Sequence, residues 1–162
     1  MISIRRHLEY ANGFLELGMI QHARRELNAI PRNERTLPAV LSMRINLHMQ
    51  ARQWRTVIAV SRQLVRAEPS DDKGWISWAF ALRELDRVRE AKEILLQALP
   101  LHGKTCAVLH YNLACYECLL GNPIEAKRHL ITATRKDKQW KDSALDDPDL
   151  KALWPEIAKM GA

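Results

Sequence analysis

The residues best suited to carry chemistry in this sequence are two cysteines, Cys115 and Cys118, separated by two residues. A Cys-x-x-Cys pair can exchange disulfides where a helix N-terminus lowers the thiol pKa, or can supply two ligands to zinc. Cys106 and His110 precede the pair. However, both cysteines fall inside a helical pattern, and no second Cys-x-x-Cys or His-x-x-x-His completes a zinc site. The spacing therefore favours small buried apolar residues, with a redox or metal role as the alternative.

The remaining polar residues form no recognisable catalytic motif. The six histidines show no ligand spacing, and the sequence has no phosphate-binding glycine loop and no Gly-x-Ser-x-Gly. Asp146, Asp147 and Asp149 resemble a calcium-binding cluster in composition, but Pro148 and the helical pattern after it fit a helix start better. We therefore expect no catalytic residue, no cofactor and no metal site. The protein is expected not to be an enzyme.

Composition is that of a globular domain. The 162 residues are 47% hydrophobic and 27% charged, with a net charge of +6 that is not concentrated in one tail. No window approaches the roughly 18 apolar residues of a membrane span, and the N-terminus lacks a signal-peptide core. Three cysteines, an odd number, favour free thiols in a reducing compartment. These features predict a cytoplasmic protein.

A repeat of 34 or 35 residues runs through most of the chain. Helical patterns alternate, and a small residue opens the second helix of each pair at Ala23, Val57, Ala91 and Ala126, at intervals of 34, 34 and 35 residues. Four units then begin near residues 4, 38, 72 and 107. Small residues at such positions allow two helices to approach closely, so antiparallel helix pairs are predicted.

The spacing of these residues resembles the tetratricopeptide repeat (TPR), a 34-residue helix–turn–helix unit. The third and fourth units carry the pattern well, through Trp75, Trp78, Ala79, Leu82, Ala91, Leu95, Ala98, Leu113, Ala114, Gly121, Ala126, Leu130 and Ala133. The first is recognisable from Tyr10, Ala11, Phe14, Gly18, Ala23 and Leu27. The second departs from it at Arg44, His48 and Ser61, so its register is less firmly set. The resemblance implies an all-α, right-handed superhelical solenoid of four helix pairs over residues 1–140.

Residues 141–162 are predicted to cap the array as part of the same domain. Asp147 fits an N-cap, Pro148 the first helical position and Asp149 the positive end of the helix dipole. The apolar stripe of the capping helix consists of Leu150, Leu153, Trp154 and Ile157. The segment resembles the Ala-Leu-x-x-Asp-Pro-Asp-Leu stretch that closes the array in some bacterial TPR proteins. A terminal cap is required because the last helix of a solenoid would otherwise expose an apolar face.

The resemblance also implies a function. TPR proteins bind a peptide or a partner helix in a concave groove lined by the first helix of each repeat, so a scaffold or adaptor is expected. The groove positions of the four repeats are occupied here by Arg5, Leu8, Asn12, Met43, Asn46, Met49, Lys73, Phe80, Arg83, Tyr111 and Asn112. The fifth position of each repeat lacks the lysine that members binding chaperone tails use, so heat-shock-protein tails are not expected. The partner is a protein or peptide of unknown identity.

Two other functions stay open. Arg55, Arg62 and Arg66 lie on one stripe of a helix, and such a stripe on the convex face can attract nucleic acid or another anionic surface. A secretion or assembly chaperone would share the fold and differ only in its partner.

Overall fold

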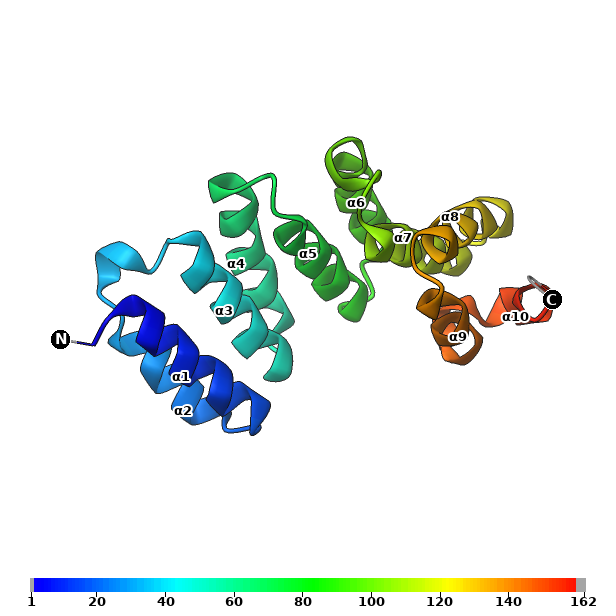
Figure 1. Cartoon of the computed structure of the whole chain (residues 1–162). Helices are drawn as coiled ribbons and strands as arrows, with labels where there is room; N and C mark the ends of the chain where they lie inside the picture. Colours follow the sequence, from blue (N-terminus) through cyan, green and yellow to red (C-terminus); the bar gives the residue numbers. More distant parts are fainter. Residues whose placement is uncertain (1, 160–162) are drawn as a thin grey trace. The chain divides into compact units, whose positions relative to one another are not determined.

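The computed structural model describes residues 2–159, and these form helices and connecting loops without any strand. Along the described chain, eight of the helices follow one another as four helix–turn–helix repeats (Figure 1). The first helices of the pairs are α1 (Ile4–Glu16), α3 (Pro38–Gln50), α5 (Asp72–Glu84) and α7 (Ala107–Leu119). The second helices are α2 (Ile20–Ala29), α4 (Trp54–Ala67), α6 (Val88–His102) and α8 (Pro123–Lys136). The all-α class is therefore confirmed. The first helices begin at residues 4, 38, 72 and 107, where the sequence period predicts the start of each repeat.

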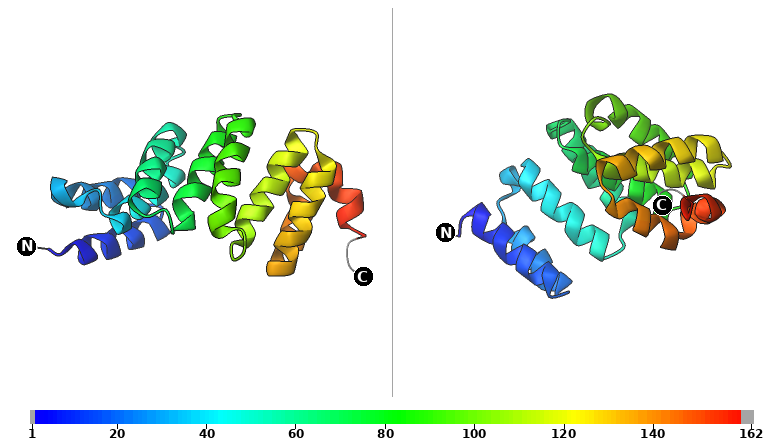
Figure 2. Two further views of the ribbon diagram at one scale, coloured as in Figure 1. Left: turned by 90° about the horizontal axis from the view of Figure 1, so that it is seen from above. Right: turned by 45° about the vertical axis from the view of Figure 1, so that its right-hand side comes forward.

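Packing divides the chain into two compact units, Met1–Ala81 and Leu82–Ala162, called here the N-terminal and C-terminal units. The division falls within α5. Figure 2 shows the same helix pairs from two other directions.

The small residues that define the repeat are fully buried. Ala23, Val57, Ala91 and Ala126 are all 0% exposed. A larger side chain at these positions would push the second helix away from the first, since protein interiors leave few voids. The common burial of Val57 with the three alanines shows that the second repeat keeps the register of the others.

Each turn within a pair contains one residue with a left-handed backbone. These are Gly18 (φ 70°), Arg52 (φ 52°), Asp86 (φ 59°) and Gly121 (φ 80°). A left-handed residue just after a helix lets the last carbonyls find donors and reverses the chain direction. The sequence indicates this turn at Gly18, Asp86 and Gly121, whereas Arg52 is an unfavourable residue type for it.

The polar residues of the second repeat bond to the ends of earlier helices. Arg44 Nη2 donates to the Leu27 carbonyl at 3.0 Å, near the end of α2. Gln50 Nε2 donates to the Leu15 carbonyl at 3.2 Å, near the end of α1. The last carbonyls of a helix have no partner within that helix, so Arg44 supplies a donor to α2, whereas the Leu15 carbonyl also accepts from the Gly18 amide. Of the departures from the TPR pattern, Arg44 thus has a structural role.

The C-terminal segment comprises α9 (Gln139–Asp146), the 3₁₀ helix η2 (Pro148–Leu153) and α10 (Trp154–Ile157), and it packs on α7 and α8. Leu150, Leu153 and Ile157 are at most 2% exposed. Asp147 is the N-cap: its Oδ1 accepts from the Asp149 amide at 2.9 Å. Three of the four residues of the predicted apolar stripe are thus buried, and the helix predicted to begin at Pro148 is 3₁₀ as far as Leu153. Within the described residues, no helix is long and apolar enough to cross a membrane.

Candidate protein-binding surfaces

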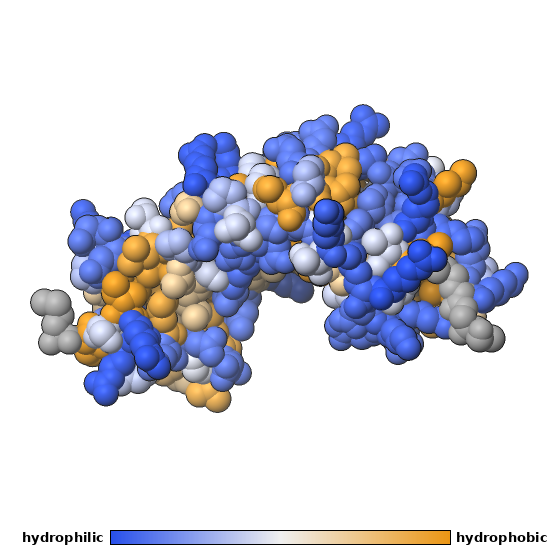
Figure 3. All heavy atoms as spheres, turned by 45° about the horizontal axis from the view of Figure 1, so that its top comes forward, coloured by the Kyte–Doolittle hydropathy of each residue, from blue (hydrophilic) through white to orange (hydrophobic). Residues whose placement is uncertain are grey.

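Four of the predicted groove residues meet in one shallow depression of the N-terminal unit. Its lining comes from α1 and α3, and its volume is about 530 Å³. The lining residues are Ile4, Arg5, Leu8, Glu9, Asn12 and Met43. Leu8 and Met43 are half-buried and pack on the core between the helices, so the floor is apolar. Figure 3 shows apolar side chains gathered on the part of the chain next to the N-terminus.

The polar rim of this depression is held by pairs along α1. Arg5 Nε donates to Glu9 at 2.8 Å, and Asn12 Nδ2 donates to Glu16 at 2.7 Å. Both pairs are exposed, so each contributes little to stability. Ile4 was not among the predicted groove residues, although its position one turn before Leu8 could have suggested it. The rim groups are thus available for exchange with a ligand.

The other predicted residues of the N-terminal unit lie farther along α3 and α5. Asn46 on α3 is half-buried, and its amide makes no hydrogen bond with any other described side chain or backbone group. Met49 packs partly against the core. Lys73 is half-buried, and burial lowers the pKa of its ammonium group, a shift that Asp71 opposes. The ring of Phe80 meets that of Trp54 edge-on, with centroids 5.9 Å apart, so Phe80 contributes to packing between repeats.

In the C-terminal unit, two predicted groove residues already make contacts with the C-terminal segment. Tyr111 is 6% exposed: its hydroxyl donates to Asp147 Oδ2 at 2.7 Å, and its ring lies against Trp140 with centroids 4.5 Å apart. Arg83 makes a two-point ion pair with Asp149, through Nε at 2.8 Å and through Nη2. The C-terminal segment therefore covers these positions. Asn112 remains half-buried on α7.

Protonation follows from these contacts. The carboxylate of Asp149 raises the pKa of Arg83, which stays a cation. Burial, with Asp147 as the second cause, raises the pKa of Tyr111, so its hydroxyl remains a donor. The two donors, Arg83 and Tyr111, thus bind the two carboxylates of Asp149 and Asp147.

The Cys-x-x-Cys pair is on the same helix. Cys115 is 4% exposed, and its thiol donates to Asp147 Oδ2 at 3.6 Å; Cys118 is half-buried. Burial raises the pKa of both thiols, and the carboxylate of Asp147 adds to the rise at Cys115. Protonated thiols are weak nucleophiles. The redox interpretation of the pair therefore gains no support.

One cluster in the described part of the chain has the composition of a metal site. A sulfur or oxygen atom from each of Cys115, Asp147 and Asp149 lies within 4.8 Å of the other two. The carboxylates, however, already accept from Tyr111 and Arg83. A metal ion would have to displace these donors, so the cluster is explained as the anchor of the C-terminal segment.

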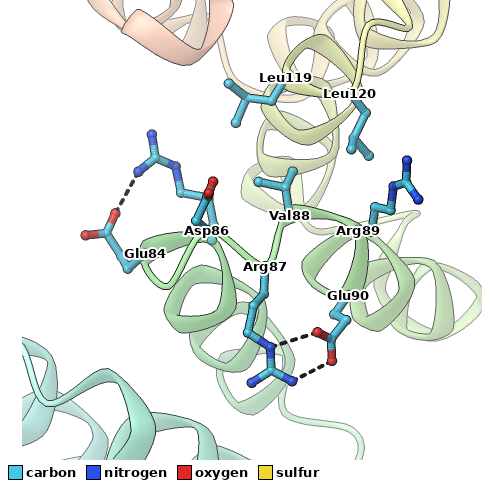
Figure 4. Close-up of a pocket in the computed structure, with 9 residues that line it drawn as sticks. Glu84, Asp86, Arg87, Val88, Arg89, Glu90, Leu119 and Leu120 are labelled. Carbon is cyan, nitrogen blue, oxygen red and sulfur yellow. Dashed lines mark hydrogen bonds and ion pairs between the residues drawn. The ribbon is translucent and has the colours of Figure 1, made fainter.

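A second hollow, of about 670 Å³, lies in the C-terminal unit where the turn between α5 and α6 faces the end of α7 (Figure 4). Four of its six charged side chains pair with one another: Arg83 with Glu84, and Arg87 with Glu90. Leu119 is 45% exposed beside them. With equal numbers of acidic and basic residues in its lining, this hollow selects no ligand charge.

The basic stripe lies on α4. Arg55, Arg62 and Arg66 are exposed, and none forms an ion pair with another described residue. The guanidinium of Arg62 lies 5.5 Å from the ring centroid of Trp78, a cation–π contact. The stripe is therefore free to meet an anionic partner.

Two histidines that the sequence did not connect meet between α7 and α8. Their Nδ1 atoms, from His110 and His129, are 3.0 Å apart, and His110 Nε2 lies 2.9 Å from the Gly103 carbonyl. Burial, and then His110, lower the pKa of His129. No spacing signal could have predicted the contact because the two residues lie on different helices, 19 residues apart.

Neither a protein-family model nor a curated protein sequence matches this chain. Solved structures do match. One described as the crystal structure of MamA protein aligns over 96% of this chain and 86% of its own, with a TM-score of 0.76 and 14% identity. A MamA structure labelled MSR-1 aligns over 85% and 79%, with a TM-score of 0.69 and 17% identity.

A third is the thermophilic TPR protein TTC0263 of Thermus thermophilus. It aligns over 98% of this chain and 82% of its own, with a TM-score of 0.71 and 14% identity. At these identities the likeness concerns the fold. The chain therefore has the TPR-like fold of a helical solenoid, as its repeats predicted.

Proposed function

We propose that this chain is a non-enzymatic protein-interaction module that holds an extended peptide or a partner helix on the first helices of its N-terminal unit. The observation that carries the proposal is the depression between α1 and α3, where Arg5, Leu8, Asn12 and Met43 come together. TPR-like neighbours support a protein-interaction scaffold in general.

The chemistry of this surface suits a peptide. Its apolar floor can exclude water from a bound side chain, and amides can donate to and accept from a peptide backbone at the same time. The amide of Asn46 would give up no hydrogen bond to another described residue on binding a peptide, whereas that of Asn12 would give up its bond to Glu16. The proposed contact set in this unit is Arg5, Leu8, Asn12, Met43, Asn46, Met49, Lys73 and Phe80.

The three free cysteines fit a reducing compartment, so we place the protein in the cytoplasm. A secretion or assembly chaperone is a form of the same proposal with a different partner. A second function, binding of nucleic acid or another polyanion, is favoured by one observation: the three unpaired arginines of α4.

A peptide selection followed by NMR mapping tests the proposal. Peptides selected from a random 12-residue display library are titrated into the isotope-labelled chain. The expected shift changes centre on α1 and α3. Asn12→Ala combined with Asn46→Ala should weaken binding about ten- to a hundredfold, because each lost hydrogen bond costs about 0.5–1.5 kcal/mol.

The matched control changes Arg55, Arg62 and Arg66 to glutamine and should leave peptide binding unchanged at moderate salt. The proposal is contradicted if the arginine changes abolish binding while the asparagine changes do not. A steep fall of affinity with salt would then identify a polyanion as the ligand.

A further inference from the structure

The start of the C-terminal segment binds its own unit through acidic side chains, as an acidic peptide of another protein could. Asp149 accepts two hydrogen bonds from Arg83, and Asp147 accepts from Tyr111 and Cys115. The residue after the second aspartate, Leu150, is 0% exposed. Residues of α5 and α7 thus contact two carboxylates and one apolar side chain of the segment.

The side chains that bind the segment occupy positions that the TPR resemblance assigns to partner binding. Arg83 and Tyr111 are among the predicted groove residues, and Cys115 lies one turn after Tyr111 on the same helix. A guanidinium fork matches a carboxylate at two points, and a phenol donates to the other carboxylate two residues earlier. The site therefore has the chemistry of an Asp-x-Asp receptor.

The ion pair can also exchange its carboxylate for another. The side chains of Arg83 and Asp149 are 32% and 13% exposed, so water reaches the ion pair and salt screens it in part. The segment is joined to α8 through the eight-residue helix α9, which keeps its local concentration high. A free peptide must overcome that advantage before it can bind.

We infer that the Arg83–Tyr111 surface is a recognition site for an acidic peptide of a partner protein with the pattern Asp-x-Asp followed by an apolar residue. The chain's own residues 147–150 occupy this site as an autoinhibitory ligand. The inference concerns a different unit from the proposed groove and does not depend on it.

The test weakens the contacts of the C-terminal segment by mutation and adds the same segment as a separate peptide. The full chain carrying Asp147→Asn and Asp149→Asn is mixed with a fluorescein-labelled peptide of residues 143–154. Asparagine is as good an N-cap as aspartate, so the turn at residue 147 is retained while the carboxylates are lost. Fluorescence anisotropy should show at least about tenfold tighter peptide binding to this loosened variant than to the parent chain.

The controls separate recognition from general attraction. Adding Arg83→Gln to the loosened variant should weaken peptide binding by about tenfold or more, whereas adding Arg89→Gln should change it less than about twofold. Arg89 is an exposed arginine only six residues away that forms no ion pair with any other described residue. A peptide with both aspartates changed to asparagine should fail to bind.

Three results would overturn the inference. Equal effects of Arg83→Gln and Arg89→Gln would show non-specific attraction. The parent chain could also dimerise by exchanging its C-terminal segment. A concentration-dependent dimer that the peptide dissociates would identify a second copy of the chain as the occupant of the site. If the loosened variant does not fold, hydrogen exchange on the parent chain decides. Excess peptide should then speed exchange in residues 147–157, and no change would refute competition.

Discussion

Arg83 on α5 and Asp149 in the C-terminal segment are 66 residues apart in sequence, and their side chains form a two-point ion pair. The Arg83 Nε to Asp149 Oδ2 distance is 2.8 Å. A partly buried pair of this geometry contributes more than a solvated one, because water competes less for its hydrogen bonds. The pair links the third repeat to the segment that follows the fourth.

The coupling free energy of this pair can be measured. A double-mutant cycle with Arg83→Gln and Asp149→Asn, followed by urea unfolding, should give about 1–2 kcal/mol, a value reduced by partial solvent screening. The Arg87–Glu90 pair, also two-point but more exposed, is the control and should couple much more weakly. Equal coupling in the two cycles would show that the Arg83–Asp149 contact does not persist in solution.

Deleting residues 141–162 should lower stability sharply. Leu150, Leu153 and Ile157 would lose their burial, which contributes roughly 1.5–3 kcal/mol for each side chain before entropy is subtracted. The truncated chain should melt at a clearly lower temperature or aggregate, as followed by circular dichroism and light scattering. Unchanged melting and solubility would mean that the segment does not pack in solution.

Arg52→Gly should raise the free energy of unfolding by up to about 1 kcal/mol. The left-handed backbone at φ 52° strains arginine by roughly 1–2 kcal/mol, and the added flexibility of glycine in the unfolded chain cancels part of the gain. The matched control is Gly121→Ala, at φ 80°, which should lower stability. Urea unfolding measures both, and a loss of stability in Arg52→Gly would contradict the described turn.

Replacing Ala114 or Ala126 with leucine should destabilise the fourth repeat by about 1–3 kcal/mol, since both are 0% exposed and extra volume strains a packed interface. Ala152 is exposed in η2, so the same change there should be nearly silent. Thermal melting of the three variants provides the measurement. Equal tolerance at all three positions would place the alanines outside the helix interface.

Stability should fall as the pH drops below about 6.5, the ordinary histidine value. Burial lowers the pKa of His129 and of His48, so the folded chain binds fewer protons than the unfolded chain in this range. Stability is then complete above the unfolded-state pKa and is lost as the pH falls through the folded-state pKa.

Urea unfolding between pH 7.5 and 5 should show this slope. The slope should be smaller in His129→Gln, which cannot titrate there. The control His22→Gln, at an exposed position on α2, should leave it unchanged. A slope that is identical in parent and His129→Gln would remove His129 as a cause.

The helix pairs could be predicted because the residues that form them recur at a regular spacing in the sequence. The recurrence of small residues at Ala23, Val57, Ala91 and Ala126 indicated where helices touch, and all four are fully buried. A repeat can be recognised in the sequence because each unit packs on its neighbours in the same way. Residues of the same size therefore recur at the same spacing. The N-cap at Asp147 was readable for a similar reason, since a cap involves residues only two or three positions apart.

Other features depended on which distant residues meet. Nothing within a few residues of Tyr111 indicates that Asp147, 36 positions later, will accept a hydrogen bond from its hydroxyl. Likewise, Arg52 takes a left-handed backbone because α3 and α4 must close on each other, against the preference of its own side chain. The sequence by itself determined the helices, their period and the N-cap of the C-terminal segment. Only the tertiary structure decided which groove positions that segment covers, because a long-range contact depends on how separate helices pack and not on the spacing of residues along one of them.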